Sequence, residues 1–480
     1  MEDIDIATIK KKSMTGIVAL TSRTFLLQLV AFGATFLLTV FLSPATFGIF
    51  FVVSAIINFL SYFSDIGLAA ALIQKKEKLT PDDLATTFTI QQLLVVPISI
   101  IAFIIAPYVG HFYRLDAAGV LLLRALIFSF FFSSLKTIPS VLLERDLNFN
   151  KLVIPQIAET VSFYIIAVVL AWKGLGVTSF TWAVMVRAFV GLILMYVISP
   201  WRIRFGIAKD VAKRLLKFGV PFQMNSFLAL LKDDLMTVFL GKILPFSQIG
   251  YIGWAKKWAE VPLRLIMDSV IRVTFPTFSR LQHSKELLGK AIENTLFGLA
   301  LTMIPISVGL LFFVEPAVTL IPKYGKWEPA IFSFSLFVFS SLLAGFSTPL
   351  TNALNAVGKI KITMSLMVFW TAATWILTVI LIHFFGFNGF AMGLCILSLS
   401  LWIVLALTRK YAVFSFVRSV GWPFLAGVLQ TACYLLFRGS GPYDMTRLVV
   451  VAGSGAILYA GVMWFAQKKR IVDIVHAFHG

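Results

Sequence analysis

Apolar runs long enough to cross a membrane recur along nearly the whole chain, and they limit what it can fold into. A transmembrane helix needs about 20 largely apolar residues. The runs are too long for strands and lack period-two alternation. The sequence therefore predicts an all-α, polytopic membrane protein of about 14 transmembrane helices, at residues 16–42, 46–73, 84–109, 117–141, 151–172, 176–198, 219–244, 249–276, 290–314, 329–350, 360–384, 388–408, 421–437 and 444–466.

The charges agree with a membrane protein and predict its orientation. Hydrophobic residues make up 59% of the chain and charged residues 13%, with a net charge of +19. With both termini in the cytoplasm, 25 of the 41 Lys and Arg residues fall in cytoplasmic loops and 7 in loops on the opposite side. This bias is what the positive-inside rule expects. We predict cytoplasmic termini and no nucleic-acid partner.

Two weak repeats indicate two similar halves. Pro44, Phe47 and Gly48 follow the first run, and Pro245, Ile249 and Gly250 follow the seventh. The segments 139–151 (PSVLLERDLNFNK) and 349–361 (PLTNALNAVGKIK) lie 210 residues apart. We predict six-helix lobes at 1–200 and 219–410, in the same orientation because six is even. A linker at 201–218 and two further helices with a cytoplasmic tail at 411–480 complete the chain. The end of the linker is either a basic amphipathic helix or a plain solvated segment.

Ionisable residues recur every four positions in the eighth run, 249–276: Lys256, Glu260, Arg264, Asp268 and Arg272, with Lys257 beside them. On a helix they lie one turn apart. A charge at the centre of a membrane helix costs about 2.5–3.5 kcal/mol, which excludes a lipid-facing stripe. We interpret the stripe as the lining of a polar cavity. The alternatives are an internally paired stripe that joins helices and an amphipathic helix at the membrane surface.

Further charges lie within the first seven runs, so we expect the first lobe and the start of the second to line the cavity. Basic groups are in excess, and arginine binds phosphate oxygens in a bidentate manner. For each charge, structural pairing is the alternative. The predicted substrate-binding residues are Arg187, Arg264, Lys256, Lys232, Arg23, Arg124, Lys257 and Arg272. The candidate coupling carboxylates, for H⁺ or Na⁺, are Asp65, Glu159, Asp233, Asp234, Glu260 and Asp268. Asp65 is equally well placed to cap a helix, and Lys136 is near enough to a run end to snorkel.

Catalytic and metal-binding motifs are absent from the sequence. It contains no GxxxxGK[ST], HExxH or GxSxG motif, and its histidines are scattered. Cys395 and Cys433 stand in apolar runs without metal or redox spacing. We expect no enzyme activity, no metal and no cofactor.

Several short segments resemble the polysaccharide or oligosaccharide flippase family, which belongs to the superfamily that also contains MATE multidrug exporters and lipid II flippases. They are KKKSMTGIVALTSRTFLLQ, SPATFGIF, SDIGLAAALIQ, LLERDLNFNKL and YGKWEPA, and the resemblance covers residues 10 to about 410. It implies export of an undecaprenyl-diphosphate-linked oligosaccharide across a bacterial inner membrane through a cationic cavity, and the two predicted lobes imply alternating access. The partners it implies are this lipid-linked oligosaccharide and membrane lipids. A multidrug or cation efflux transporter is the alternative, and a polysaccharide polymerase or ligase is a further one.

Overall fold

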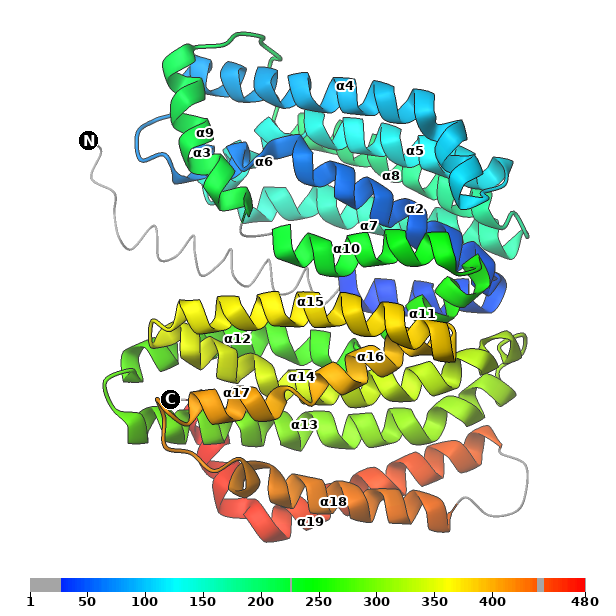
Figure 1. Cartoon of the computed structure of the whole chain (residues 1–480), viewed down its shortest axis with the longest axis vertical. Coiled ribbons are helices and arrows are strands. Elements are labelled where there is room, and N and C mark those ends of the chain that lie inside the picture. The colour runs from blue at the N-terminus through cyan, green and yellow to red at the C-terminus, as the bar shows by residue number, and fades with distance from the viewer. Residues whose placement is uncertain (1–26, 225–226, 438–443, 480) are drawn as a thin grey trace. The chain divides into compact units, whose positions relative to one another are not determined.

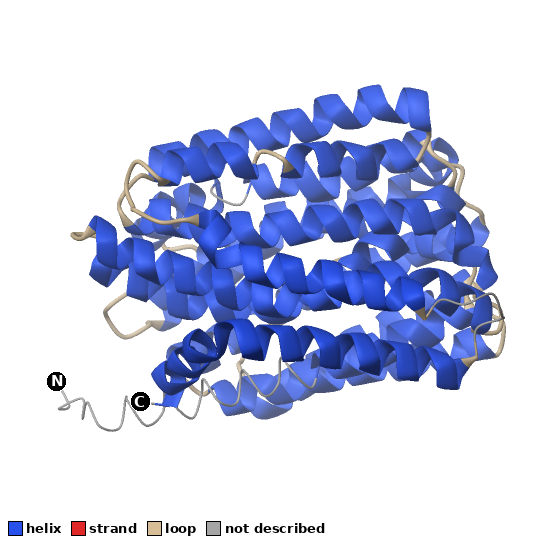
Figure 2. Ribbon diagram, turned by 90° about the horizontal axis from the view of Figure 1, so that it is seen from below, coloured by secondary structure: helices blue, strands red, loops and turns tan. Residues whose placement is uncertain are grey.

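The computed structural model describes residues 27–224, 227–437 and 444–479, and this part of the chain contains helices and no strand (Figures 1 and 2). Eleven of its helices are long and apolar enough to cross a membrane. The all-α, multi-pass membrane fold is therefore confirmed. The number of about 14 spans stays a prediction, and residues 1–26, which include Arg23, lie outside the described residues.

The chain forms two compact units, Met1–Gly250 and Tyr251–Gly480. The division into lobes at 1–200 and 219–410 stays a prediction. The first unit holds the helix Leu27–Phe41, then α2 (Pro44–Asp65), α3 (Leu68–Gln74), α4 (Pro81–Tyr113), α5 (Ala117–Leu135), α6 (Thr137–Arg145), α7 (Phe149–Trp172), α8 (Val177–Ile198), α9 (Lys209–Met224), α10 (Phe227–Ile243) and the start of α11 (Phe246–Ala259). The second unit holds the end of α11, then α12 (Val261–Leu281), α13 (Lys285–Leu320), the short 3₁₀ helix η1 (Gly325–Ala330), α14 (Ile331–Ala356), α15 (Ile360–Phe385), α16 (Asn388–Ser398), α17 (Leu401–Thr408), α18 (Phe416–Leu436) and α19 (Met445–His479).

The first pair of repeated segments meets in the first unit, at the starts of α2 and α11. A Cβ on Gly48 would lie 1.9 Å from the carbonyl oxygen of Phe246, and a Cβ on Gly250 would lie 1.9 Å from that of Pro44. Both glycines are therefore needed for close backbone approach. The two contacts are reciprocal, as in a symmetric pair, which supports the internal repeat.

The predicted span 46–73 is interrupted, and the structure corrects it to two helices. Ile66 and Gly67 both adopt left-handed backbone conformations, with φ of 45° and 74°, and separate α2 from α3. Gly67 is needed here for a second reason, because a Cβ would lie 2.3 Å from the carbonyl oxygen of Gly219 in α9. The chain therefore changes direction directly after Asp65.

The predicted span 117–141 is also two helices, α5 and α6, which meet at Lys136. Pro139 has no N–H group to donate to the carbonyl of Leu135 four residues earlier. The Tyr196 hydroxyl in α8 donates to that carbonyl instead, at 3.0 Å. The hydrogen bond from Tyr196 therefore ties the junction between α5 and α6 to α8.

The predicted span 249–276 is divided between α11 and α12, which meet at Glu260. Because Pro262 has no backbone N–H, the helical hydrogen bond to the carbonyl of Trp258 is missing. Neighbouring helical bonds persist, from the Glu260 N–H to Lys256 and from the Arg264 N–H to Glu260, each at 3.0 Å. The four-residue spacing of charges therefore continues across the break between α11 and α12, and the spacing alone did not reveal this break.

Each unit has its own apolar core. In the first, Leu68, Leu72, Phe88 and Ile138 are fully buried where α3, α4 and α6 pack together. In the second, the core is larger and is centred on α13 and α14, with Ile292, Leu296, Phe297 and Leu350 fully buried. Large apolar side chains elsewhere on the spans are exposed, as expected for surfaces that face lipid.

Candidate functional site

A cavity of about 560 Å³ lies inside the first unit, among α2 to α8. Its wall is unusually polar for the interior of membrane-spanning helices. Four serines of the wall come from α5 and α6, and five ionisable groups join them. The polar residues that line this serine-lined cavity are Asn58, Ser61, Ser64, Asp65, Gln91, Ser129, Ser133, Ser134, Lys136, Thr137, Ser140, Glu144, Gln156, Glu159 and Arg187.

The helix interruption at Lys136 places this side chain in the cavity. Lys136 is the residue between α5 and α6, and its ammonium group forms an ion pair with the Glu159 carboxylate of α7. Only 15% of the Lys136 side chain and 14% of the Glu159 side chain are exposed. Snorkelling to the membrane surface, which the sequence allowed for Lys136, is therefore not observed.

Arg187 of α8 lies on the other side of the same carboxylate. Its Nε is 3.9 Å from Glu159 Oε2, and half of its side chain is exposed. Its Cζ lies 5.9 Å from the ring centroid of Phe163. Among the described residues, no hydrogen bond satisfies the guanidinium donors of Arg187. A planar guanidinium that is held in place with donors to spare is suited to bind an anion.

Gly191 provides the room for the Glu159 side chain. It stands one turn after Arg187 on α8, and a Cβ there would lie 1.8 Å from Glu159 Oε1 and 2.4 Å from its carboxyl carbon. The carboxylate therefore lies directly against the α8 backbone. The positions of both cations depend on this close approach, because both approach the same carboxyl group.

Asp65 also lines the cavity, but its carboxylate has a structural use. The Ala69 N–H, at the start of α3, donates to Asp65 Oδ1 at 3.1 Å and to Oδ2 at 3.3 Å. An acidic group is favourable at a helix N-terminus, where N–H groups lack helical partners. Asp65 therefore caps α3, the alternative role that its position in the sequence allowed.

The remaining candidates of the first unit lie outside the cavity wall. Arg124 stacks on Phe103, with 4.9 Å from its Cζ to the ring centroid. Lys232 and Asp233 stand on α10, half-buried and exposed respectively. Asp234 accepts a hydrogen bond of 3.1 Å from Asn58, which does line the cavity. Asp234 is thus one hydrogen bond away from the site.

In the second unit, the predicted stripe is internally paired where it is described. Glu260 accepts a hydrogen bond from Arg264 at 2.8 Å and lies 4.0 Å from Lys256, and 60% of the Arg264 side chain is exposed. Lys257 is half-buried. The side chains of Asp268 and Arg272 lie outside the described residues. That the charges of this stripe and Arg187 line one common cavity stays a prediction.

The charge of the serine-lined cavity differs from the predicted excess of positive groups. Three carboxylates, of Asp65, Glu144 and Glu159, face two cations, of Lys136 and Arg187. Within this cavity the cationic excess is therefore not found, and for the whole pathway it stays a prediction. Two of the carboxylates have local structural partners: Asp65 accepts the Ala69 N–H at the start of α3, and Glu159 pairs with Lys136 between α5 and α6.

Sequence reasoning undervalued Lys136 and missed the serines and amides of the wall. Gln91 donates to Thr137 Oγ1 at 2.9 Å, and Gln92 donates to Ser134 Oγ at 3.1 Å, so that α4 is tied to the α5–α6 interruption. The signal that was available was Pro139, five residues after the serine pair at 133 and 134, because proline predicts an interruption.

Comparison with known proteins places the chain in a family. The sequence profile described as "Polysaccharide biosynthesis protein" matches residues 37–332. The succinoglycan biosynthesis transport protein of Rhizobium meliloti is 22% identical over 91% of this chain and 90% of its own length. The lipopolysaccharide biosynthesis protein WzxC of Escherichia coli is 25% identical over 68% of this chain and 66% of its own.

Solved structures show the same fold. A lipid II flippase in an inward closed conformation aligns with a TM-score of 0.77 at 15% identity, over 95% of this chain and all of that one. An inward-facing multidrug resistance MATE family transporter aligns with a TM-score of 0.62 at 16% identity, over 82% of this chain and 97% of that one. The chain is therefore a multi-pass transmembrane protein with the fold of these solved transporters, and it belongs to the polysaccharide biosynthesis protein family.

Proposed function

We propose that this protein moves an oligosaccharide linked to undecaprenyl diphosphate from the cytoplasmic to the outer leaflet of a bacterial inner membrane. Both termini would lie in the cytoplasm, as the distribution of Lys and Arg predicts. The family and the flippase-type fold support this substrate class. The protein would act as a transporter and not as an enzyme.

The observation that carries the proposal is the state of Arg187. It lies at membrane depth, beside a cavity large enough for a sugar headgroup, with half of its side chain exposed. A guanidinium within a membrane span whose donors are unused is costly unless an anion completes its hydrogen bonds. The diphosphate of the substrate would supply that anion, and the serines and amides of the wall would bind sugar hydroxyls.

Arg264 would take the same role in the second unit. Its side chain is more exposed than that of Arg187, and its recorded partner is Glu260 on the preceding turn. Pairing with a neighbouring carboxylate holds the guanidinium in place and limits its desolvation cost while the pathway is empty. We propose that the two arginines receive the diphosphate at successive stages of an alternating-access cycle.

Glu159 is our candidate for H⁺ or Na⁺ coupling. It is nearly buried, and it lies between the two cations of the cavity. Entry of an anionic headgroup at Arg187 would weaken the attraction between Arg187 and Glu159, and would so favour uptake of a proton or sodium ion by the carboxylate. Ion uptake and substrate binding would then be coupled.

The test is export in a strain that lacks its own copy of the gene. Arg187→Ala and Arg264→Ala should each lower surface polysaccharide at least about tenfold, because each removes charge-assisted hydrogen bonds to phosphate. Arg204→Ala, which removes a cation from an exposed loop, is the matched control and should leave export unchanged. The membrane abundance of each variant must equal that of the wild type.

Unaltered surface polysaccharide in both arginine variants would overturn the proposal. Cation efflux is the second candidate, because the serine-lined cavity holds one more carboxylate than cations. It predicts that deletion of the gene sensitises cells to cationic drugs while surface polysaccharide stays normal. Chain lengthening by the purified protein would instead indicate a polymerase.

A further inference from the structure

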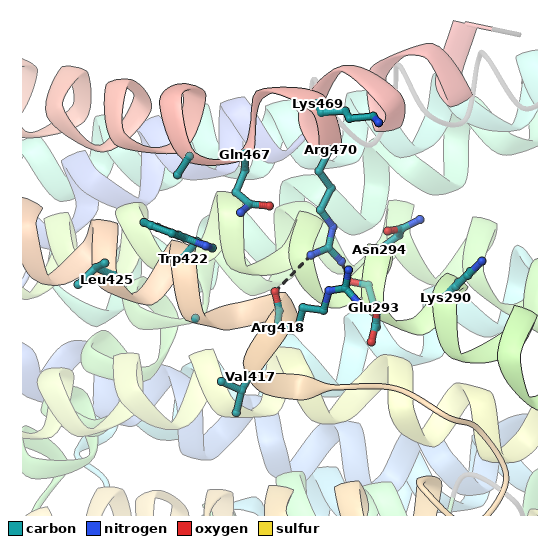
Figure 3. A pocket seen from close by; sticks show the side chains of 12 residues that line it. Lys290, Glu293, Asn294, Val417, Arg418, Trp422, Leu425, Gln467, Lys469 and Arg470 are labelled. Atoms are coloured by element: carbon teal, nitrogen blue, oxygen red, sulfur yellow. Dashed lines mark hydrogen bonds between the residues drawn. The ribbon is translucent and has the colours of Figure 1, made fainter.

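A second pocket, of about 800 Å³, lies entirely within the second unit, where α13 and α18 begin and α19 bends at Gln467 (Figure 3). All three helices are candidate membrane spans. The pocket is therefore at the level where spans emerge from the membrane, and the charge distribution predicts that this side is cytoplasmic. We call it the basic pocket, after Lys290, Arg418, Lys469 and Arg470 in its wall.

The four cations face a single carboxylate, which is already in use. Glu293 Oε1 accepts the backbone N–H of Ser415 at 2.7 Å, just before α18 begins. Among the described residues, the side chains of Lys290, Arg418 and Lys469 have no hydrogen bond or ion pair. Three cations around one pocket repel one another, and they are stabilised when an anion binds between them.

Arg470 makes the pocket a built feature and not a chance gathering of surface lysines. Its guanidinium donates to the backbone carbonyls of Glu293 at 3.0 Å and of Arg418 at 3.3 Å. Its Cζ lies 4.3 Å from the ring centroid of Phe297. α19 bends at Gln467, whose backbone is non-helical, and the residues after the bend reach the pocket. Arg470 thus joins α13, α18 and α19.

The other end of the pocket is apolar and open. Trp422 and Leu425 lie on α18 away from the cations, as Figure 3 shows, and 45% and 46% of their surfaces are exposed. Leu425 stands seven positions after Arg418 on α18, which is about 10 Å along the helix axis. Val417, at the cationic end, is 73% exposed, so the pocket is open there as well. A ligand that fits this pocket has an anionic group for the cationic end and apolar chains about 10 Å from that group.

We propose that the basic pocket binds the phosphodiester headgroup of an anionic phospholipid from the leaflet on that side, with the acyl chains along Trp422 and Leu425. Basic pockets between spans are suited to such headgroups. A soluble phosphate would use the cations but leave the apolar end unoccupied. The proposal is independent of what the protein transports, since it concerns a site in the second unit that the proposed pathway residues do not line.

The test is native mass spectrometry of the full chain in detergent, titrated with phosphatidylglycerol, phosphatidylcholine or inorganic phosphate. We expect one phosphatidylglycerol to bind more tightly than phosphatidylcholine. The double variant Lys290→Gln/Arg418→Gln should weaken phosphatidylglycerol binding at least about tenfold. Neither side chain has a partner to lose, so the variant should fold, and an unchanged unfolding midpoint checks this.

The matched control is Arg409→Gln/Lys410→Gln, which removes two exposed cations from the same side of the membrane but outside the pocket. It should bind phosphatidylglycerol like the wild type. Equal binding by the Lys290/Arg418 variant and the wild type would overturn the proposal, as would equal binding of phosphatidylcholine. Displacement of phosphatidylglycerol by inorganic phosphate at matched concentration would show a site for soluble phosphate instead, and would also overturn it.

Discussion

In the serine-lined cavity of the first unit, Lys136 and Arg187 share the Glu159 carboxylate. In the basic pocket of the second unit, Lys290, Arg418 and Lys469 surround one carboxylate that accepts a backbone N–H. The difference follows from burial. Only 15% of the Lys136 side chain and 14% of the Glu159 side chain are exposed, and a buried cation needs a partner that the protein itself provides, because desolvation is expensive. Lys290, Arg418 and Lys469 are exposed, so they keep their water and remain available to a ligand.

The comparison predicts that removing a cation costs stability in the first region and almost none in the second. Lys136→Met leaves Glu159 nearly buried with only the more distant Arg187 beside it, so we expect a loss of about 2–3 kcal/mol in the free energy of unfolding. Lys290→Met, in the basic pocket, should change it by less than about 0.5 kcal/mol. Thermal unfolding of the purified proteins in one detergent measures both.

The double variant Lys136→Met/Glu159→Leu sharpens this prediction. Replacement of both members of a buried pair by apolar groups removes the uncompensated charge. It should therefore recover much of the stability that Lys136→Met loses, although export should stay defective. Equal midpoints for Lys136→Met and Lys290→Met would show that the Lys136–Glu159 ion pair contributes no more to stability than the exposed Lys290.

A smaller effect is expected from filling the space beside Glu159. In Gly191→Ala, the new Cβ would overlap the carboxylate, which has to move away from α8 and hence from Arg187. Overpacking of this kind costs about 1–3 kcal/mol, and we expect the lower half of that range because a side chain can shift more easily than backbone. The readouts are the unfolding midpoint and export.

Gly33→Ala is the control for the glycine substitution, since a Cβ there meets no atom within 4 Å. It should leave the midpoint unchanged or raise it slightly, because alanine is the better helix former. A wild-type midpoint and normal export for Gly191→Ala would contradict the close approach of Glu159 to α8.

The sequence was sufficient to predict the membrane class and the helical fold, because long apolar runs have few other solutions. Most predicted spans match observed helices within several residues. It was insufficient at Ile66, Lys136 and Glu260, where predicted spans are interrupted. Left-handed backbone and missing proline N–H groups act over two or three residues, and hydropathy averaged over about 20 residues does not register them.

The same interruptions explain why the cavity was only partly predicted. Arg187, Glu159 and Asp65 were identified because charges within apolar runs are conspicuous. Lys136 was undervalued because its position near a span end favoured snorkelling, whereas the turn between α5 and α6 directs it inward. Counting charges along the sequence also says nothing of which ones share a cavity, and so the acidic excess of this one was not expected.

The smallest expected effect separates a structural carboxylate from a functional one within a single cavity. Asp65→Asn keeps an amide oxygen that accepts the Ala69 N–H, so stability should change by less than about 0.5 kcal/mol. If capping is the whole role of Asp65, export should stay within about twofold of the wild type.

Glu159→Gln also keeps its shape but loses the charge that both cations share, and we expect export to fail. Surface polysaccharide and membrane abundance, measured for both variants side by side, decide the matter: loss of export in Asp65→Asn at normal abundance would make Asp65 a coupling group, because the cap alone has no need of its negative charge.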